Sequence, residues 1–221
     1  MIVDELITDR TQAEVARLRE LLLIGWANMT EAQKAEYAAS RGEYRPSDLN
    51  RVSEAEEYIA DEFNDFIGDL SVAYTTAIAD ILGSLEYPTK YYDIPTPVIP
   101  TSYGDAEYSS VTIYPVKTNW TYTDIQQGVT DISYYLANVR LLRGLLPLTA
   151  PTTPSTLDGL TFEGANAIEQ ILLATHNALM AHITVKNNAL QAKKNEDKEK
   201  YRLASVPWIQ SAEFAAGEIT M

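Results

Sequence analysis

One apolar stripe constrains the fold of this 221-residue chain more than any other feature. It follows Pro46, Ser47 and Asp48, which are typical of a helix start, and it stops at Gly83. Its members recur every three or four residues: Val52, Ala55, Ile59, Phe63, Phe66, Leu70, Ala73, Ala77 and Ile81. This spacing predicts one amphipathic helix of about 35 residues. Further helices must cover its apolar face, so we expect a mainly α-helical bundle.

Two shorter helices are predicted before the long one. Thr11–Glu14 fits a capping box, and apolar residues follow at helical spacing until Gly25. Thr30–Gln33 repeats this pattern and starts a second helix, which we expect to end at Arg41–Gly42. Together with the long helix, they form a predicted N-terminal helical module over residues 1–83.

Residues 84–120 have a different character, because proline and tyrosine are frequent and no helical period is present. Such a stretch favours extended backbone, so we predict an arm or linker. Ser110–Tyr114 alternates between polar and apolar residues, as a short β-strand does. An isolated strand needs a partner for its backbone groups, and another chain can supply that partner.

The helical pattern returns in residues 121–204, for which we predict a C-terminal helical hairpin module. The first helix starts at a cap formed by Thr121 or Thr123 and stops before a proline-rich linker. Thr161 caps the second, longer helix. Residues 205–221 then form an aromatic tail.

The two predicted modules share a weak internal repeat. At a shift of 77 residues, Val52 aligns with Val129 and Tyr58 aligns with Tyr135, in the same helical phase. We therefore expect two similar helical halves joined by the extended segment.

Charge and composition exclude several classes of partner. The chain has 31 acidic and 17 basic residues and a formal net charge of −14, which repels phosphate backbones and anionic lipids. No apolar run approaches the roughly 20 residues of a membrane span, and the N-terminus lacks the pattern of a signal peptide. We expect no nucleic-acid binding, no membrane insertion and synthesis in a cytoplasm. Without cysteine, the chain has neither disulfides nor thiolate zinc sites.

The sequence offers little for catalysis. His176 and His182 are six residues apart, which places them on different faces of a helix. Asp61, Asp65 and Asp69 line one helix face, and a solvated surface explains them better than a cation site. Motifs for a nucleophile elbow, a P-loop, a dinucleotide site or a zincin helix are absent from the sequence. We expect no enzymatic activity, no catalytic residue, no cofactor and no metal site.

Aromatic residues are concentrated in the extended segment and near the C-terminus. Exposed tyrosine and tryptophan offer large contact areas at low entropic cost. The predicted assembly contacts are Tyr103, Tyr108, Ile113, Tyr114, Trp208 and Phe214. The alternative is that these side chains fold back onto the helices of their own chain.

Six stretches of the sequence resemble structural proteins of tailed phages and prophages of Gram-positive bacteria. The stretches are Asp9–Gln12, Gly25–Thr30, Asp48–Val52, Asn119–Trp120, Tyr135–Arg140 and Leu160–Asn166. The resemblance implies a minor virion protein of the tail, baseplate or fibre region, present as symmetric copies.

The resemblance and the helical pattern lead to one functional expectation. We expect a non-enzymatic structural protein of the virion, made in the host cytoplasm, that binds other copies of itself and other virion proteins. One alternative is a module of a tail fibre that binds a glycan or protein on the host surface. A second is a cell-wall hydrolase, which needs paired carboxylates in a cleft.

Overall fold

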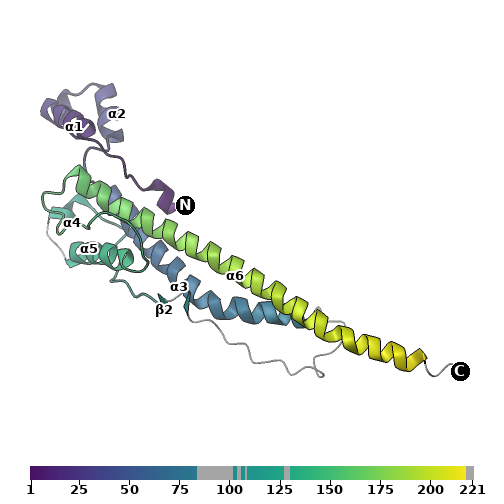
Figure 1. Ribbon diagram of the computed structural model, residues 1–221. Coiled ribbons are helices and arrows are strands. Elements are labelled where there is room, and N and C mark those ends of the chain that lie inside the picture. The colour runs from purple at the N-terminus through teal and green to yellow at the C-terminus, as the bar shows by residue number, and fades with distance from the viewer. Residues whose placement is uncertain (84–101, 104–105, 108, 127–129, 218–221) are drawn as a thin grey trace. The chain divides into compact units, whose positions relative to one another are not determined.

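The computed structural model describes most of the chain, namely residues 1–83, 102–103, 106–107, 109–126 and 130–217. Six α-helices within these residues confirm the predicted mainly α-helical fold (Figure 1). With 3-10 helices written η, the elements are η1 (Ile2–Glu5), α1 (Gln12–Ile24), η2 (Trp26–Asn28), α2 (Glu31–Ala39), α3 (Pro46–Gly83), β1 (Ser102–Tyr103), β2 (Ala106–Glu107), α4 (Tyr122–Gln126), α5 (Thr130–Arg143) and α6 (Phe162–Gly217).

The predicted helix starts agree with the structure. At α1, the Thr11 side chain accepts a hydrogen bond from the Glu14 backbone, and the Glu14 carboxylate accepts one from the Thr11 backbone. Thr30 and Gln33 make the same reciprocal pair at α2. Each capping box pairs backbone donors that the first turn of a helix leaves free.

The C-terminal helices differ from the prediction in their extent. The described parts of the first predicted helix are α4 and α5, and residues 127–129 between them lie outside the described part. Thr121 caps α4, and Thr161 caps α6 by accepting a hydrogen bond from the Gly164 N–H. α6 runs from Phe162 to Gly217 and so includes residues 205–217 of the predicted aromatic tail.

The chain forms two compact units that cut across the predicted modules. Unit 1 comprises Met1–Asn64 and Ser110–Met180, and unit 2 comprises Asp65–Ser109 and Ala181–Met221. Each unit therefore draws on both halves of the sequence, because α3 and α6 each contribute residues to both units.

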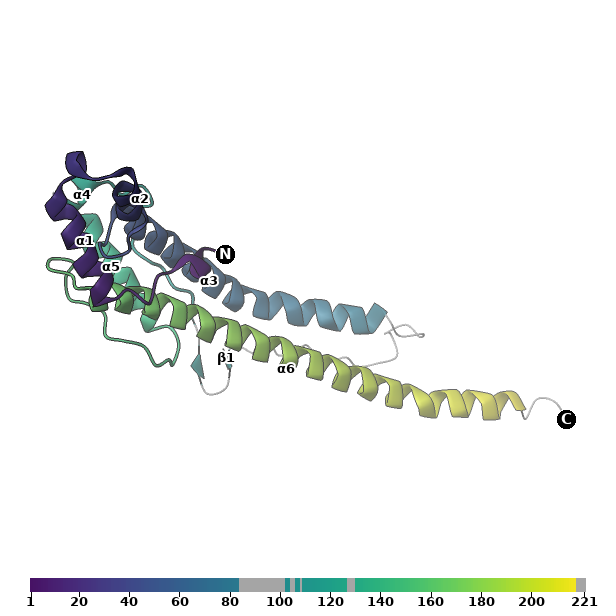
Figure 2. The ribbon, with the colours of Figure 1, turned by 90° about the horizontal axis from the view of Figure 1, so that it is seen from above.

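The core of unit 1 is formed by α3, α5 and α6. Within this unit, the first part of α6 runs alongside the first part of α3 (Figures 1 and 2). Buried apolar side chains from the three helices are Val52, Ala55, Ile59, Leu136, Val139, Leu142, Ile168, Ile171 and Leu172. Full burial of one such side chain stabilises a fold by about 1.5–3 kcal/mol, so this cluster is the main apolar contribution to unit 1.

Unit 2 contains the later parts of α3 and α6 and the pair β1–β2. The two strands are antiparallel. Lys186 of α6 is buried, donates a hydrogen bond of 3.0 Å to the Phe66 carbonyl, and has its ammonium 5.0 Å from the centre of the Phe66 ring. Its long side chain thus satisfies a backbone acceptor and contacts an aromatic face at the same time.

Helices α1 and α2 form a hairpin at the N-terminal end of unit 1. Arg17 of α1 makes two hydrogen bonds of 2.7 and 2.8 Å to Glu36 of α2. Gly42, after α2, approaches the α1 backbone so closely that a Cβ atom there would lie 2.5 Å from the Glu14 carbonyl oxygen. Only glycine allows this approach without moving backbone.

Replacing Gly42 by alanine should therefore destabilise the protein by about 2 kcal/mol, because the added methyl group overpacks against backbone atoms. Chemical denaturation measures the change in the free energy of unfolding. Gly144→Ala is the matched control, since its added Cβ would lie 3.4 Å from the nearest atom, the Leu141 carbonyl oxygen. Equal stability of the two variants would contradict the close approach.

Candidate functional site

Three long irregular segments of unit 1, residues 6–11, 109–121 and 144–161, lie against helices. Backbone N–H and C=O groups that leave water need hydrogen-bond partners, and a segment outside helices and sheets has none of its own. In this protein the partners are side chains of the adjoining helices. We call these contacts the clamps, and together they form the most distinctive polar arrangement of the unit.

Two asparagines hold residues 109–121 through paired hydrogen bonds. Asn64 of α3 accepts from the Val111 N–H at 2.8 Å and donates to the Val111 carbonyl at 2.9 Å. Asn138 of α5 does the same with Tyr114, at 2.8 and 3.2 Å. An asparagine amide carries one acceptor and two donors, so it pairs with an extended backbone as a neighbouring strand does.

The end of the same segment is anchored at Trp120. Its backbone N–H donates to Asn50 at 2.6 Å, and its indole N–H donates to the Ser53 hydroxyl at 3.2 Å. The indole ring is 4% exposed and meets the Tyr135 ring edge-on. Trp120 thus inserts into the core with its polar atom paired.

These contacts correct the expected strand at Ser110–Tyr114. These residues form no β-ladder with another described segment, and asparagine side chains take the place of a neighbouring strand at Val111 and Tyr114. The two amides come from α3 and α5 of the same chain.

The N-terminal segment is clamped by α6. Asn166 accepts from the Arg10 N–H at 3.0 Å and donates to the Arg10 carbonyl at 2.9 Å. One turn further along α6, Gln170 donates to the Thr8 carbonyl at 3.0 Å. The residues that precede α1 are therefore fixed on the surface of a helix more than 150 positions away in sequence.

Four charged side chains form a buried network beneath this segment. Arg10 donates to Asp48 at 2.9 Å and to Glu169 at 2.7 Å, and Arg51 donates to the same two carboxylates. Glu169 also accepts from the Ile7 N–H. Two positive and two negative charges balance, which is the condition under which a buried ionic group is tolerated. Removal of one partner from such a network typically costs about 3–5 kcal/mol.

Two tyrosines connect this network to the core. Tyr44 lies with its ring 5.3 Å from the Arg10 guanidinium, and its hydroxyl is 2.5 Å from that of Tyr135. Burial raises the pKa of both phenols. Both hydroxyls therefore stay protonated and act as hydrogen-bonding groups over the usual pH range.

Arginines of α5 clamp the third segment. Arg143 donates to the carbonyls of Ala150 and Pro151 at 3.1 and 2.9 Å, and Arg140 donates to those of Pro154 and Ser155. A guanidinium has several donors in one plane, so one side chain satisfies two successive carbonyls. Both arginines also lie in the last turn of α5, where positive charge interacts favourably with the helix dipole.

Glu56 of α3 is a buried acid that forms no ion pair among the described residues and pairs with an amide instead. It is 1% exposed, one carboxylate oxygen accepts from Asn138 at 3.2 Å, and the other has no hydrogen-bond partner among the described residues. Burial raises the pKa of this carboxyl well above its ordinary value, although the hydrogen bond from Asn138 lowers it in part. Glu56 therefore retains its proton to higher pH than the exposed acids do.

The predicted assembly contacts are distributed over several environments. Ile113 packs partly buried against the core of unit 1, and Tyr114 is 46% exposed and stacks on Tyr134 with ring centres 4.9 Å apart. The remaining predicted contacts have side chains outside the described residues: Tyr103, Tyr108, Trp208 and Phe214.

The residues considered for metal binding do not converge. His176 is largely buried, with its ring 5.9 Å from that of Tyr58. Asp61 and Asp65 lie exposed on α3. Within the described residues, no group of three or more histidine, aspartate or glutamate side chains has the geometry to hold a metal ion.

Sequence reasoning missed the clamp residues, although a signal was present. Glu56, Asn138 and Glu169 each lie in phase with an apolar stripe, where a polar residue is unexpected. A polar side chain at a core position requires a buried partner, and this rule identifies the three residues without a structure. Their partners are side chains and backbone groups distant in sequence, which the rule does not identify.

No protein-family model, curated protein or solved structure matches this chain. In the described part, no helix is both long enough and apolar enough to cross a membrane.

Replacing Asn138 by alanine should release residues 109–121. The change removes both hydrogen bonds to Tyr114 and leaves buried polar groups unpaired, which should cost about 3 kcal/mol. Trypsin cleavage after Lys117, followed by mass spectrometry, measures the release, and we expect a rate increase of roughly 100-fold. Asn119→Ala is the control, because Asn119 is exposed in the same segment. If cleavage after Lys117 is equally slow in both variants, the clamp does not hold the segment.

Replacing Glu56 by glutamine should remove a pH-dependent loss of stability. The folded state holds the Glu56 proton above the ordinary pKa of 4.5, whereas the unfolded chain loses it there, so the stability of the wild type falls as pH rises. The stability difference in favour of Glu56→Gln should grow by up to about 1.4 kcal/mol per pH unit. The stability difference stops growing once the pH exceeds the pKa of Glu56 in the folded protein.

Chemical denaturation of the wild type and of Glu56→Gln at several values between about pH 4 and pH 8 measures the stability difference. Glu57→Gln is the matched control, because Glu57 is the exposed neighbour of Glu56 on α3. A difference that stays constant with pH would show that Glu56 ionises normally in the folded protein.

Proposed function

We propose that this protein is a non-enzymatic structural component of a tailed-phage or prophage virion, in the tail or baseplate region. The observation that carries the proposal is the use of buried polar side chains in unit 1. Asparagine, glutamine and arginine residues hold irregular backbone in place, and the buried acids pair with arginines or with an amide. This is the chemistry of a rigid scaffold.

The stretches that resemble phage structural proteins contribute many of these side chains. Arg10, Asp48, Asn50, Asn138 and Asn166 all belong to them, and all five make the hydrogen bonds described above. The resemblance lies in short motifs scattered along the chain. That five of their residues hold backbone segments or belong to the buried ionic network supports a common scaffold role.

A scaffold role fits the physical cost of the network. A protein that packs into a larger particle has to present its surface in one geometry, and clamped segments have fewer alternative conformations than free loops. Because the clamped segments are already held in place, the protein loses less conformational entropy on assembly. The proposed partners are other copies of this chain and other virion proteins.

The proposal places the assembly surface outside residues 109–121. The extended segment of residues 84–120 is predicted to be an arm or linker, and another chain can pair with it. Its described final part is occupied by contacts with α3 and α5 of the same chain, and residues 84–101 lie outside the described part. Apolar side chains that remain exposed are better candidates for contact with neighbours.

Co-expression tests the proposed function. The full chain is produced together with the products of the genes that adjoin its own, and the complexes are weighed by native mass spectrometry. We expect a stoichiometric complex that contains several copies of this chain and at least one tail or baseplate protein. Failure to join any such complex, together with absence from purified particles, would refute the virion role.

A host-surface binding module is the second candidate, and one observation favours it. Tyr114 stacks on Tyr134 and is 46% exposed, and exposed aromatic rings are surfaces on which sugar rings pack. If this role is correct, isolated protein binds a glycan array or host cells, and Tyr114→Ala abolishes the binding. Tyr122→Ala is the control, since Tyr122 is 56% exposed outside the stack. An assembly role alone predicts no binding by either protein.

A further inference from the structure

Residues 109–121 run along one face of α3 in the direction opposite to the helix. Asn64 binds the backbone near the start of this segment, and Ser53 binds the Trp120 indole at its end. Glu56 follows Ser53 by about one helical turn and so lies between these two contacts. The segment therefore passes over a buried acid that it does not touch directly.

The cover over Glu56 is thin, and one amide connects it to the acid. Tyr114 is 46% exposed, whereas Asn138 and Glu56 are each 1% exposed. Asn138 holds the Tyr114 backbone through two hydrogen bonds and donates a third to one Glu56 oxygen. The other Glu56 oxygen has no hydrogen-bond partner among the described residues. Displacement of Tyr114 therefore opens the amide, and the carboxyl behind it, to water.

No cation among the described residues pairs with Glu56. In the covering segment, Lys117 pairs with Asp124 at 3.5 Å. On α6, Glu169 is held by two arginines, and the His176 ring lies 5.9 Å from a tyrosine ring of α3. If Glu56 lost its proton in place, its charge would therefore stay buried and uncompensated, which is costly.

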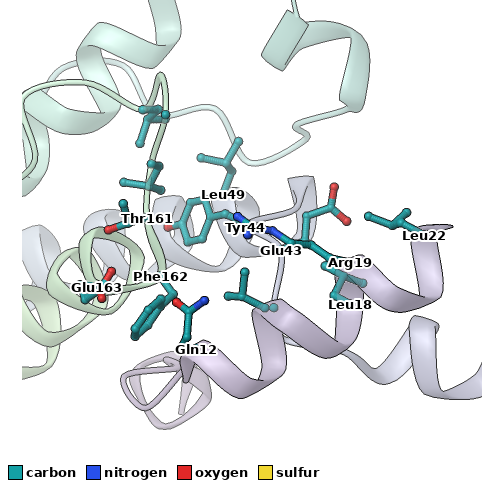
Figure 3. Close-up of a pocket in the computed structure, with 15 residues that line it drawn as sticks. Gln12, Leu18, Arg19, Leu22, Glu43, Tyr44, Leu49, Thr161, Phe162 and Glu163 are labelled. Carbon is teal, nitrogen blue, oxygen red and sulfur yellow. The ribbon is translucent and has the colours of Figure 1, made fainter.

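Tyr135 is the ionisable neighbour of Glu56 on α5. Burial, and after it the neighbouring Tyr44 and Glu56, raises the pKa of the Tyr135 phenol, which stays protonated. Its hydroxyl pairs with that of Tyr44, which lines a groove beside α1 (Figure 3). Both phenols are neutral over the usual pH range, so neither offsets a charge on Glu56.

We propose that Glu56 makes the Asn138 clamp proton-dependent: the residues around Tyr114 are held while Glu56 is protonated and are released when it loses its proton. Helices α3, α5 and α6 stay packed in the released form. This inference goes beyond the proposed virion role and does not depend on it.

Proton linkage gives the direction and the size of the effect. In the closed form, burial raises the pKa of Glu56 well above its ordinary value of 4.5, and the hydrogen bond from Asn138 offsets part of this rise. In the released form, water reaches the carboxyl and its pKa returns toward 4.5. Release is therefore accompanied by loss of a proton, and above that pH its equilibrium constant rises by up to about tenfold per pH unit. The rise ends once the pH exceeds the pKa of Glu56 in the closed form.

Release of the segment costs less than unfolding of the helices beneath it. Residues 109–121 have no strand partner in the described part of the chain, and the backbone of Val111 and Tyr114 depends on two side-chain amides. Segments held in this way open more often than the helices of a core. The cost of ionising Glu56 is thus relieved first by the segment that covers it.

Amide hydrogen exchange of the full chain, followed by NMR, tests the inference at the hydrogen bond concerned. The Tyr114 N–H exchanges with solvent when its hydrogen bond to Asn138 opens. Its exchange rate in the wild type, divided by the rate in Glu56→Gln at the same pH, compares the release equilibria, because the intrinsic exchange rate is the same in both proteins. We expect this ratio to rise with pH by up to about tenfold per unit and then to become constant. A ratio that does not change with pH would overturn the inference.

The helices show whether the release is local. Exchange of the Val139 and Ile171 N–H groups, in α5 and α6, measures unfolding of the unit, because both residues are fully buried within helices. At about pH 8, we expect the Tyr114 N–H to be at least roughly tenfold less protected than these two groups. Equal protection would mean that Tyr114 opens only when the helices unfold, which contradicts the proposed release.

Glu57→Gln is the matched control, because Glu57 is exposed beside Glu56 on the same helix. Its ratio should stay constant with pH, and a rise equal to that of Glu56→Gln would show that the effect does not come from Glu56. The wild type alone gives a second measurement if Glu56→Gln does not fold. After correction for the intrinsic pH dependence of exchange, protection of its Tyr114 N–H should fall by up to about tenfold per pH unit. Constant protection would refute the proton dependence.

Discussion

Pairing of backbone groups away from regular secondary structure is the constraint on which unit 1 depends. Three long segments cross helix surfaces without forming a β-sheet, and their N–H and C=O groups would be costly if left unpaired. Side chains of α3, α5 and α6 provide the partners, with asparagine at the positions where a donor and an acceptor are needed together. The helices therefore act both as a hydrophobic core and as a template for the segments.

The buried charges serve the same constraint at an energetic cost. Arg10, Arg51, Asp48 and Glu169 lose hydration on burial, and hydrogen bonds among themselves and to backbone groups of Ile7 and Arg45 compensate for that loss. Apolar residues of similar volume would give comparable stability but could not hold the N-terminal segment in one register. Glu56 accepts a hydrogen bond from Asn138, the amide that holds Tyr114, so a buried acid orients this buried clamp. Specific geometry, rather than added stability, is what such groups provide.

A unit with clamped connections leaves few surfaces free to adapt to a partner. The surface it presents is set by these contacts, and exposed apolar side chains such as Leu23 and Trp26 lie on it. Assembly through preformed surfaces loses little conformational entropy. The proposed assembly role thus depends on the clamped connections.

Local sequence patterns specify the helices and the residues at which they start. Capping boxes at Thr11 and Thr30 and the stripe from Val52 predicted α1, α2 and α3 correctly, because these signals depend on residues within a turn or two of each other. Which segments are clamped, and by which side chains, depends on how the helices pack. Asn166 reaches Arg10 and Asn138 reaches Tyr114 across long sequence separations, and no local pattern specifies such pairs. Polar residues at core positions of the helices indicate that buried partners exist. The packing of α3, α5 and α6 determines which groups those partners are.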